Sequence, residues 1–319
     1  MSIALTPFTG SAAARFLHDV RAGLRQPQKR LPCKYLYDQR GSELFDQICD
    51  LDEYYPTRTE LAITRRYAGE IADQIGAGAA LVEYGSGSSV KTRLLLDELS
   101  DARAYVPVDI SREHLASAAG RIATAYPSLD VLPVCADFTQ ELVLPVFPRQ
   151  PTHSAVYFPG STIGNFPPSA AQELLRSIRG TVGVGGGAIL GIDLQKPVEV
   201  VTAAYNDAEG VTAAFNLNLL ERINRELGAD FCVDDFEHRA DYNAKHGRID
   251  MLLVAQRDQV VEIAGEQVEF QAGETIHTEH SHKYTLDGFA ELAAEAGLTM
   301  HKAWTDAKRW FAVVHLVAE

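Results

Sequence analysis

The sequence predicts an α/β fold, with a doubly wound, mostly parallel sheet and a second, smaller α+β domain. Three observations predict it. Short apolar runs alternate with helical segments between about residues 79 and 194, and such alternation produces a parallel sheet with helices on both faces. The alternation stops after Asp193, where a helical stretch and closely spaced strands follow. The length of 319 residues allows one large core with an insertion, or two modest domains.

Charge and composition limit the partners of this chain. Its 43 acidic residues against 29 Lys and Arg give a net charge of -14, which argues against a broad phosphate-neutralising surface and hence against nucleic acid. No apolar run approaches the ~20 residues that span a bilayer, and the N-terminus lacks the pattern of a secretory signal. We therefore expect a small-molecule substrate, with neither nucleic acid nor a membrane as partner. The protein is also expected to be cytoplasmic and a monomer.

The four cysteines are Cys33, Cys49, Cys135 and Cys232, and no two of them form a C-x-x-C pair. This scatter suggests neither a zinc site nor a disulfide framework. We expect ordinary buried thiols in a reducing compartment.

The N-terminal zone, up to residue 57, is predicted to contain helices and loops, beginning with a surface helix over 11–24. Thr57 and Glu60 have the spacing of a capping box, in which two side chains satisfy free N–H groups at a helix start. A helix over 58–75 is therefore predicted.

Repeated strand and helix patterns follow. Each apolar run is short enough for a buried strand, and the intervening segments have helical periodicity. The predicted strands are 80–84, 105–109, 131–134, 155–158 and 188–192, with helices over 90–99, 112–126 and 169–178.

After residue 193 the pattern predicts an insertion: a helical stretch over 198–227, a strand over 249–254, and an antiparallel hairpin of 260–263 with 268–270. A helix over 287–296 and strands over 299–304 and 310–316 return to the sheet. The predicted division assigns 58–195 and 286–319 to a cofactor-binding domain, and 1–57 and 196–285 to a substrate-binding domain.

The turn EYGSG (83–87) ends the first predicted strand and opens into a helix. Its two glycines let the backbone approach a ligand closely. Val90 occupies the position where a P-loop needs glycine, so that motif is excluded. A dinucleotide fingerprint also lacks its third glycine there, although Asp109 lies at a suitable distance for a ribose, so NAD stays an alternative.

S-adenosylmethionine is the cofactor that the pattern favours. An acid ends the second strand (Asp109) and another ends the third (Asp137, before Phe138), and together with E-x-G-x-G these residues resemble the class I methyltransferase pattern. The resemblance implies that the first acid binds the ribose hydroxyls and that the second, with its neighbour, binds the adenine. Alternatively, both acids could merely cap the next helix or turn.

Longer blocks make the resemblance more specific. Taken together they resemble the histidine-specific N-alpha-methyltransferase family of ergothioneine biosynthesis, over nearly the whole chain after about residue 30. The blocks are YDQRGS (37–42), EYYPTRTE (53–60), GSGSSVKTR (85–93), FPGSTIGNF (158–166), AYND (204–207) running on to FN (215–216), and HTEHSHKY (277–284).

The resemblance implies a Rossmann-like methyltransferase sheet and a set of site residues. It implies that the cofactor is contacted by Gly85, Lys91, Asp109, Asp137 and Phe138. It implies that the substrate pocket is formed by Tyr55, Asn165, Tyr205, Met251, Glu279 and Ser281.

The chemistry of these side chains is compatible with histidine. Asn165 and Tyr205 can donate to a carboxylate, and Tyr55, Glu279 and Ser281 can pair with two imidazole nitrogens. Glu279 and Ser281 are two residues apart, so on a strand they face the same way.

Simpler roles stay open for several of these residues. Tyr54 and Tyr55 could be aromatic contacts between the two zones, and Asn165 could be a turn residue after glycine. Met251 could fill the core of a strand, and Lys91 could be a solvated helix residue.

Five histidines lie between residues 238 and 282, three of them within HTEHSH (277–282). On a regular strand His277 points with Glu279, whereas His280 and His282 point to the opposite face, so these three histidines are not expected to converge on a metal. His238 and His246 lie in a polar stretch and are expected at the surface. We therefore expect no metal.

Methyl transfer from a sulfonium needs a neutral acceptor amine, so a proton must leave in each round. We hypothesise that Tyr37 lies near this nitrogen as the catalytic residue and that water carries the proton away. The family's product is N-alpha-trimethylhistidine (hercynine). The alternatives are methylation of another aromatic amino acid, such as a tryptophan or tyrosine derivative, and a non-catalytic cofactor-binding module.

Overall fold

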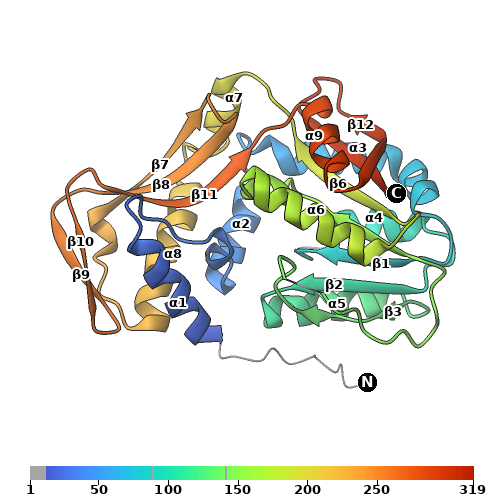
Figure 1. Ribbon diagram of the computed structural model, residues 1–319, viewed down its shortest axis with the longest axis horizontal. Coiled ribbons are helices and arrows are strands. Elements are labelled where there is room, and N and C mark those ends of the chain that lie inside the picture. The colour runs from blue at the N-terminus through green and yellow to red at the C-terminus, as the bar shows by residue number, and fades with distance from the viewer. Residues whose placement is uncertain (1–11, 88–89, 141) are drawn as a thin grey trace. The chain divides into compact units, whose positions relative to one another are not determined.

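The computed structural model describes residues 12–87, 90–140 and 142–319. Within them the chain forms two compact units (Figure 1). The first unit comprises Pro56–Gln195 and Lys283–Glu319, and the second comprises residues 12–55 and Lys196–His282. The functional roles expected for the two parts of the chain stay predictions.

The first unit is built on one sheet whose strands run in the order β12-β13-β6-β5-β1-β2-β3. The pairs from β6 to β3 are parallel, and β12 and β13 are antiparallel additions at one edge. The strands are β1 (Ala80–Tyr84), β2 (Ala104–Asp109), β3 (Asp130–Val131), β4 (Val134–Cys135, also paired with β2), β5 (Ser154–Phe158), β6 (Gly187–Asp193), β12 (Leu298–Thr305) and β13 (Phe311–Ala318).

Helices cover both faces of this sheet, because its central strands are buried on both sides. One apolar cluster joins the sheet to α6 and α9, and another joins it to α3, α4 and α5. The predicted doubly wound fold is confirmed. The helices are α3 (Tyr55–Ile75), α4 (Val90–Glu98), α5 (Arg112–Ala125), α6 (Pro168–Val182) and α9 (Leu286–Ala294).

Two local predictions for this unit are wrong. The single strand expected over 131–134 is divided into two-residue strands β3 and β4. The capping box is absent, because α3 begins at Tyr55 and Thr57 lies inside it. The buried carboxylate of Glu60 instead accepts the Gly160 N–H at 3.0 Å and forms an ion pair with Lys91.

The second unit contains a three-stranded antiparallel sheet, β11-β8-β7, and the separate hairpin β9-β10. The predicted hairpin is confirmed, with Val268 paired to Val261. Helix α8 packs on α2, β7 and β8. The elements are α1 (Ala12–Leu24), η1 (Cys33–Leu36), α2 (Gln39–Asp50), α7 (Val198–Ala203), α8 (Val211–Leu227), η3 (Val233–Asp235), β7 (Phe236–Asn243), β8 (Arg248–Ala255), β9 (Gln259–Ile263), β10 (Glu266–Phe270) and β11 (Thr275–His282).

The helical stretch predicted over 198–227 is two helices. Gly210 adopts a φ of 74°, which ends helical continuity between them. The Asp207 carboxylate accepts the N–H groups of Val211 and Thr212, each at 2.8 Å, at the start of α8. A glycine and a capping carboxylate therefore divide this stretch.

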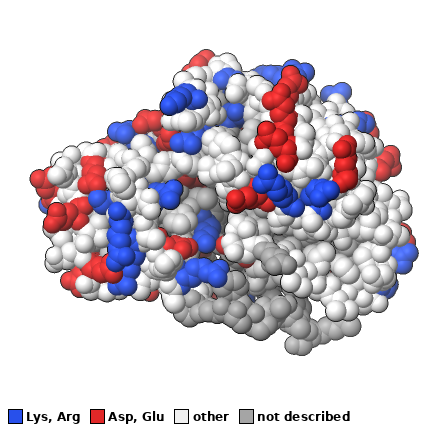
Figure 2. Space-filling model, in the orientation of Figure 1, with Lys and Arg blue, Asp and Glu red and all other residues white. Residues whose placement is uncertain are grey.

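The cysteines differ from expectation in their burial. Cys33, Cys49 and Cys135 are half-buried free thiols, and Cys232 is exposed. Figure 2 shows acidic and basic side chains interspersed over the face that it presents. Among the described residues, the helices all fall short of the length and apolarity that a membrane crossing demands.

Candidate active site

The residues expected to hold the cofactor converge at one edge of the large sheet. Tyr84 of β1 pairs with Val108 of β2, and Asp109 pairs with Cys135 of β4. The three strands are parallel, so their carboxyl ends open onto the same edge. Gly85 follows β1 directly, Asp109 ends β2, and the Asp137-Phe138 pair follows β4 after one intervening residue.

The glycine turn leaves space for a ligand. Gly85 has a φ of 73°, a conformation that favours glycine, and its N–H donates to the Val108 carbonyl at 2.9 Å. A Cβ added at Gly87 would meet no described atom within 4 Å. The turn can therefore accept a cofactor against its backbone.

The Asp109 carboxylate makes one hydrogen bond to the backbone and can accept others from a ligand. Its Oδ1 accepts a hydrogen bond from the Ser111 N–H at 2.8 Å, just before α5 begins. Asp109 therefore has part of the capping role that was the alternative to ligand binding. Burial raises the pKa of this carboxyl. A carboxylate has several acceptor positions on two oxygens, so this bond is compatible with binding a ribose hydroxyl.

Asp137 and Phe138 border the same edge. The Asp137 Oδ1 accepts from both the N–H and the hydroxyl of Thr139, at 3.1 and 2.5 Å. Phe138 is half-buried, and its ring is stacked on Tyr84 with centroids 5.4 Å apart. An aromatic surface beside a polar turn suits a purine ring.

Two buried carboxylates at this edge were not predicted. Glu83 accepts hydrogen bonds from the hydroxyls of Thr92 and Tyr105, and burial raises its pKa to about 7 despite these bonds. Glu60 binds Lys91, which is therefore neither fully solvated nor free. The helical periodicity of α3 could have indicated that Glu60 points inward. The capping-box spacing instead suggested that Glu60 pairs with Thr57.

Asn165 belongs to the first unit, at the end of η2 (Thr162–Asn165), which follows β5. Ser161 before it has a φ of 56°, and its hydroxyl accepts the Asp193 N–H at 2.8 Å. This bond ties the η2 segment to the carboxyl end of β6. Asn165 therefore lies at the edge where α/β sheets bind ligands.

The other predicted substrate residues belong to the second unit, three of them on one face of its sheet. Glu279 pairs with Met251, and Ser281 pairs with Ile249. All four side chains are buried, with Glu279 only 7% exposed. The prediction that Glu279 and Ser281 face the same way is consistent with this register.

Tyr205 connects this face to the helices. Its hydroxyl lies 2.6 Å from the Ser281 hydroxyl, and its ring contacts Tyr54 with centroids 6.2 Å apart. Tyr54 in turn contacts Phe45. Tyr54 is thus part of a buried aromatic wall inside the second unit.

Tyr37 lies at the same wall. Its ring contacts Phe45 and Phe215 edge-on, each with centroids 5.4 Å apart. Burial, reinforced by the negative charge of Glu279, raises the pKa of Tyr37 well above its ordinary value. The phenol is therefore neutral at physiological pH.

Tyr55 has a cationic partner that the sequence did not suggest. The Lys196 ammonium lies 2.7 Å from the Tyr55 hydroxyl, and the phenol ring is fully buried. Lys196 comes three residues after the end of β6 in the sequence, and segments that follow such strands often carry ligand-binding residues in α/β sheets. This place in the sequence is the signal that could have identified Lys196 as a candidate site residue.

Other residues of the shared sequence blocks have structural roles. Asn206 bonds both backbone groups of Ala240, and Asn216 donates to the Leu252 carbonyl. His238, expected at the surface, is half-buried and lies 2.9 Å from the Tyr205 carbonyl. His246 is exposed, as predicted.

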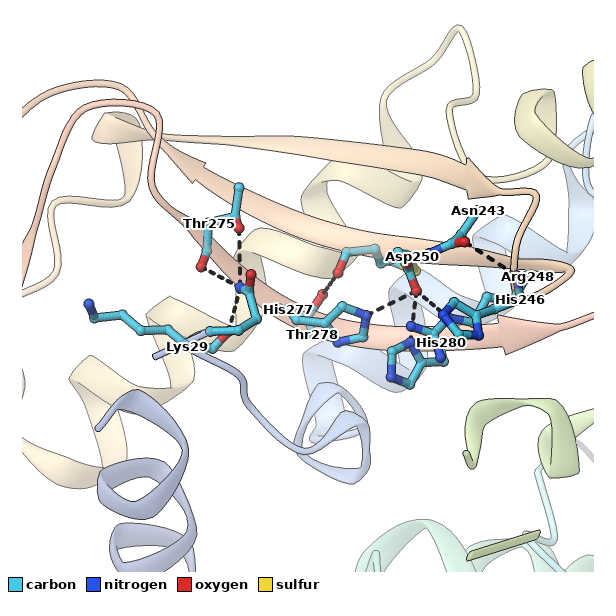
Figure 3. Close-up of polar contacts among 11 residues, drawn as sticks. Lys29, Asn243, His246, Arg248, Asp250, Thr275, His277, Thr278 and His280 are labelled. Carbon is cyan, nitrogen blue, oxygen red and sulfur yellow. Dashed lines mark hydrogen bonds and ion pairs between the residues drawn. The ribbon is translucent and has the colours of Figure 1, made fainter. Parts of the chain in front are cut away.

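The direction expected for His277 on β11 is wrong, whereas His280 and His282 lie on the face opposite Glu279, as predicted. A β-bulge at Thr278 shifts the register between His277 and Glu279, so His277 lies on the same face as His280. Their ring centroids are 3.9 Å apart, and both rings reach Asp250 (Figure 3).

The charges of Asp250 and its neighbouring histidines influence one another. Burial alone would raise the pKa of Asp250, but hydrogen bonds from His277, His280, Asn243 and Arg248 hold it well below its usual range. Burial lowers the pKa of His280. The Asp250 carboxylate is therefore ionised at physiological pH.

The fold and the residues at the sheet edge together define an S-adenosylmethionine-dependent methyltransferase. The family described as "Histidine-specific methyltransferase, SAM-dependent" matches residues 16–318. The chain belongs to this family.

Three relatives show the extent of the similarity. The chain is 45% identical to a histidine N-alpha-methyltransferase of Mycolicibacterium smegmatis, over 93% of this chain and 92% of the relative. It is 42% identical to that of Mycobacterium tuberculosis, over 90% of each. It is 31% identical to ergothioneine biosynthesis protein 1 of Neurospora crassa, over 91% of this chain and 33% of that protein.

Proposed function

We propose that this enzyme transfers methyl groups from S-adenosylmethionine to the α-amino nitrogen of L-histidine. Three rounds give N-alpha-trimethylhistidine (hercynine), a step toward ergothioneine. The observation that carries the substrate assignment is the buried polar group Glu279, Ser281 and Tyr205 beside an aromatic wall in a chain of the histidine-specific family. A buried carboxylate and hydroxyls suit a small ring with two nitrogens.

Each side chain has a proposed task in binding. Glu279 and Ser281, with Tyr55, pair with the imidazole nitrogens, while Asn165 and Tyr205 donate to the substrate carboxylate. Met251 pairs with Glu279 on the neighbouring strand. We propose that its side chain forms the apolar part of the pocket beside the Glu279 carboxylate. A site that holds both ends of histidine retains the substrate as its amine gains methyl groups.

The proposed cofactor contacts are Gly85, Lys91, Asp109, Asp137 and Phe138. Space at the glycine turn, the remaining acceptor capacity of Asp109 and the half-buried ring of Phe138 support this assignment. When bound, the cofactor supplies an electrophilic methyl group for in-line displacement. The protein's part is to orient the amine and exclude competing nucleophiles.

The acceptor amine must lose its proton before it attacks. We assign Tyr37 the task of hydrogen bonding to this nitrogen as a neutral phenol, because its raised pKa opposes a role as a phenolate base. Water then carries the proton away. The half-buried ring of Tyr37 contacts Phe45 and Phe215 edge-on, which supports a fixed orientation of the phenol.

The two compact units fit a division of labour. The first unit, with the large sheet, would bind the cofactor, and the second would supply most of the substrate pocket. The free thiols of the four cysteines support a reducing compartment such as the cytoplasm. We further propose that the enzyme acts as a monomer.

Replacement of Glu279 tests the substrate assignment. We expect Glu279→Ala to raise the KM for histidine by about 100-fold, because removing a charged hydrogen-bond partner costs about 1.5–3 kcal/mol or more. The dissociation constant for S-adenosylmethionine, measured by calorimetry, should stay within about twofold. Glu237→Ala, which removes an exposed carboxylate from β7, is the matched control.

Equal losses of histidine and cofactor binding in Glu279→Ala would contradict the assignment. The competing functions separate in one assay, in which the protein is mixed with labelled S-adenosylmethionine and histidine, tryptophan or tyrosine, and products are resolved by mass. Label on tryptophan or tyrosine alone would overturn the histidine proposal. Cofactor binding without any methylated product would favour the non-catalytic module.

A further inference from the structure

The face of β8 and β11 opposite Glu279 carries a cluster of metal-ligating side chains. Asp250 pairs with His280 across the two strands, and the bulge at Thr278 brings His277 to the same face. Glu279 and Ser281 lie on either side of His280 in the sequence, so their side chains point to the opposite face of the strand. They pair with Met251 and Ile249 of β8. The cluster is therefore separate from the proposed substrate residues.

The ligand atoms of this cluster converge. His277 Nε2 and His280 Nδ1 lie 3.3 and 2.8 Å from the same oxygen of Asp250, and all three atoms lie within 4.8 Å of one another (Figure 3). Ligand atoms around a tetrahedral zinc ion are about 3.3 Å apart, given zinc–ligand bonds of about 2.0–2.1 Å. We propose that Asp250, His277 and His280 bind a divalent transition-metal ion of the zinc type.

The donor set and its exposure fit such an ion. Two imidazole nitrogens and one carboxylate oxygen are common zinc ligands, and water can occupy the fourth position. The three side chains are 15%, 15% and 22% exposed for His277, Asp250 and His280. All three side chains are thus partly exposed to solvent, from which an ion and a water ligand would come.

Neighbouring groups hold the carboxylate in place. Asn243 donates to Oδ2 of Asp250 at 2.9 Å, and Arg248 donates to Oδ1 at 2.6 Å. The ion would replace Arg248 at Oδ1, while Asn243 keeps the carboxylate oriented. Such outer partners fix the direction of a metal ligand.

His282 provides a second observation beside the cluster. It lies two residues beyond His280 on the same strand, with ring centroids 5.9 Å apart, and it is 93% buried. Its Nε2 has no hydrogen-bond partner among the described residues. A buried imidazole nitrogen normally has a partner, and a metal-bound water is the kind of group that would satisfy it.

The ion would act structurally. His277 and His280 flank the bulge residue Thr278, and Asp250 lies on the neighbouring strand. Binding all three joins β8 to β11 across the irregular part of their pairing. A ligand that binds only the folded state stabilises it, so the ion should raise the thermal midpoint of unfolding.

The test uses the full chain, stripped with a chelator and then titrated with Zn²⁺ or Co²⁺. We expect one ion per chain, a higher Tm with zinc, and visible cobalt bands without the near-ultraviolet charge-transfer band of thiolate ligands. His277→Ala and His280→Ala should each weaken zinc binding by about 100-fold, since loss of an outer partner alone costs about 10–100-fold. His301→Ala, which removes an exposed histidine of the first unit, is the control and should bind as wild type.

Three results would overturn the proposal: no stoichiometric binding at micromolar zinc, a thiolate band with cobalt, or unchanged affinity in the ligand variants. His280→Phe keeps the ring volume without its nitrogens, and far-ultraviolet circular dichroism would establish that it is folded. If folded His280→Phe binds zinc like wild type, the site is wrong. None of these readouts depends on methyl transfer, so failure here leaves the proposed function standing.

Discussion

The hydroxyl oxygens of Tyr205 and Ser281 lie 2.6 Å apart, and both side chains are buried. One residue follows α7 and the other lies on β11, so this hydrogen bond joins a helical segment to the strand that carries Glu279. Removing either hydroxyl takes this hydrogen bond away, and a typical hydrogen bond contributes about 0.5–1.5 kcal/mol.

We expect Tyr205→Phe and Ser281→Ala each to raise the KM for histidine by about tenfold, with little change in cofactor affinity. Because the two hydroxyls share one bond, the double variant should lose less than the sum of the single losses. Steady-state kinetics and calorimetry with S-adenosylmethionine measure both quantities.

Tyr126→Phe is the matched control, because it removes a hydroxyl that donates to Asp97 in the first unit, at an exposed position. A fall in Tm without any change in KM for the Tyr205 and Ser281 variants would show that the pair only stabilises the fold.

A methyl group at Gly87 should interfere with the cofactor and not with the fold. A Cβ there meets no described atom within 4 Å, and Gly87 is not among the positive-φ glycines of the described chain. We expect Gly87→Ala to keep the Tm of the ligand-free protein and to weaken S-adenosylmethionine binding by about tenfold or more, by blocking close approach to the backbone.

Gly120→Ala is the control for this substitution. Gly120 lies in α5, and a Cβ there also meets nothing within 4 Å, so the change should raise stability slightly through helix propensity and leave cofactor affinity alone. If Gly87→Ala binds the cofactor as tightly as wild type, the glycine turn does not contact it.

The cofactor edge could be predicted from sequence because its determinants are local. The strand preceding Gly85 and the acid at Asp109 lie at the ends of short buried runs, and parallel strands bring such ends together. That Glu279 and Ser281 face the same way also followed from strand periodicity, and their register agrees with it.

Features that depend on distant contacts were not predictable in this way. The bulge at Thr278 reversed the expected direction of His277, because one extra residue changes the phase of a strand. Glu60 matched a capping box by spacing, yet its carboxylate binds Gly160, a residue 100 positions away. Local patterns contain no information about such partners.

Glu83 provides a prediction about pH. Burial raises its pKa from 4.5 to about 7 in the folded protein. Between these values the folded state holds a proton that the unfolded chain has lost, so stability falls as pH rises and levels off above about 7. The size of this effect is at most about 3 kcal/mol.

Glu83→Gln is neutral at every pH and should remove this contribution. We expect the free energy of unfolding of wild type, measured with urea from about pH 5 to about pH 8, to fall relative to that of Glu83→Gln as pH rises. Glu98→Gln, at an exposed position on α4, should follow the wild-type curve. A constant difference between wild type and Glu83→Gln across this range would mean that Glu83 is ionised in the folded protein throughout, with Thr92 and Tyr105 outweighing the cost of burial.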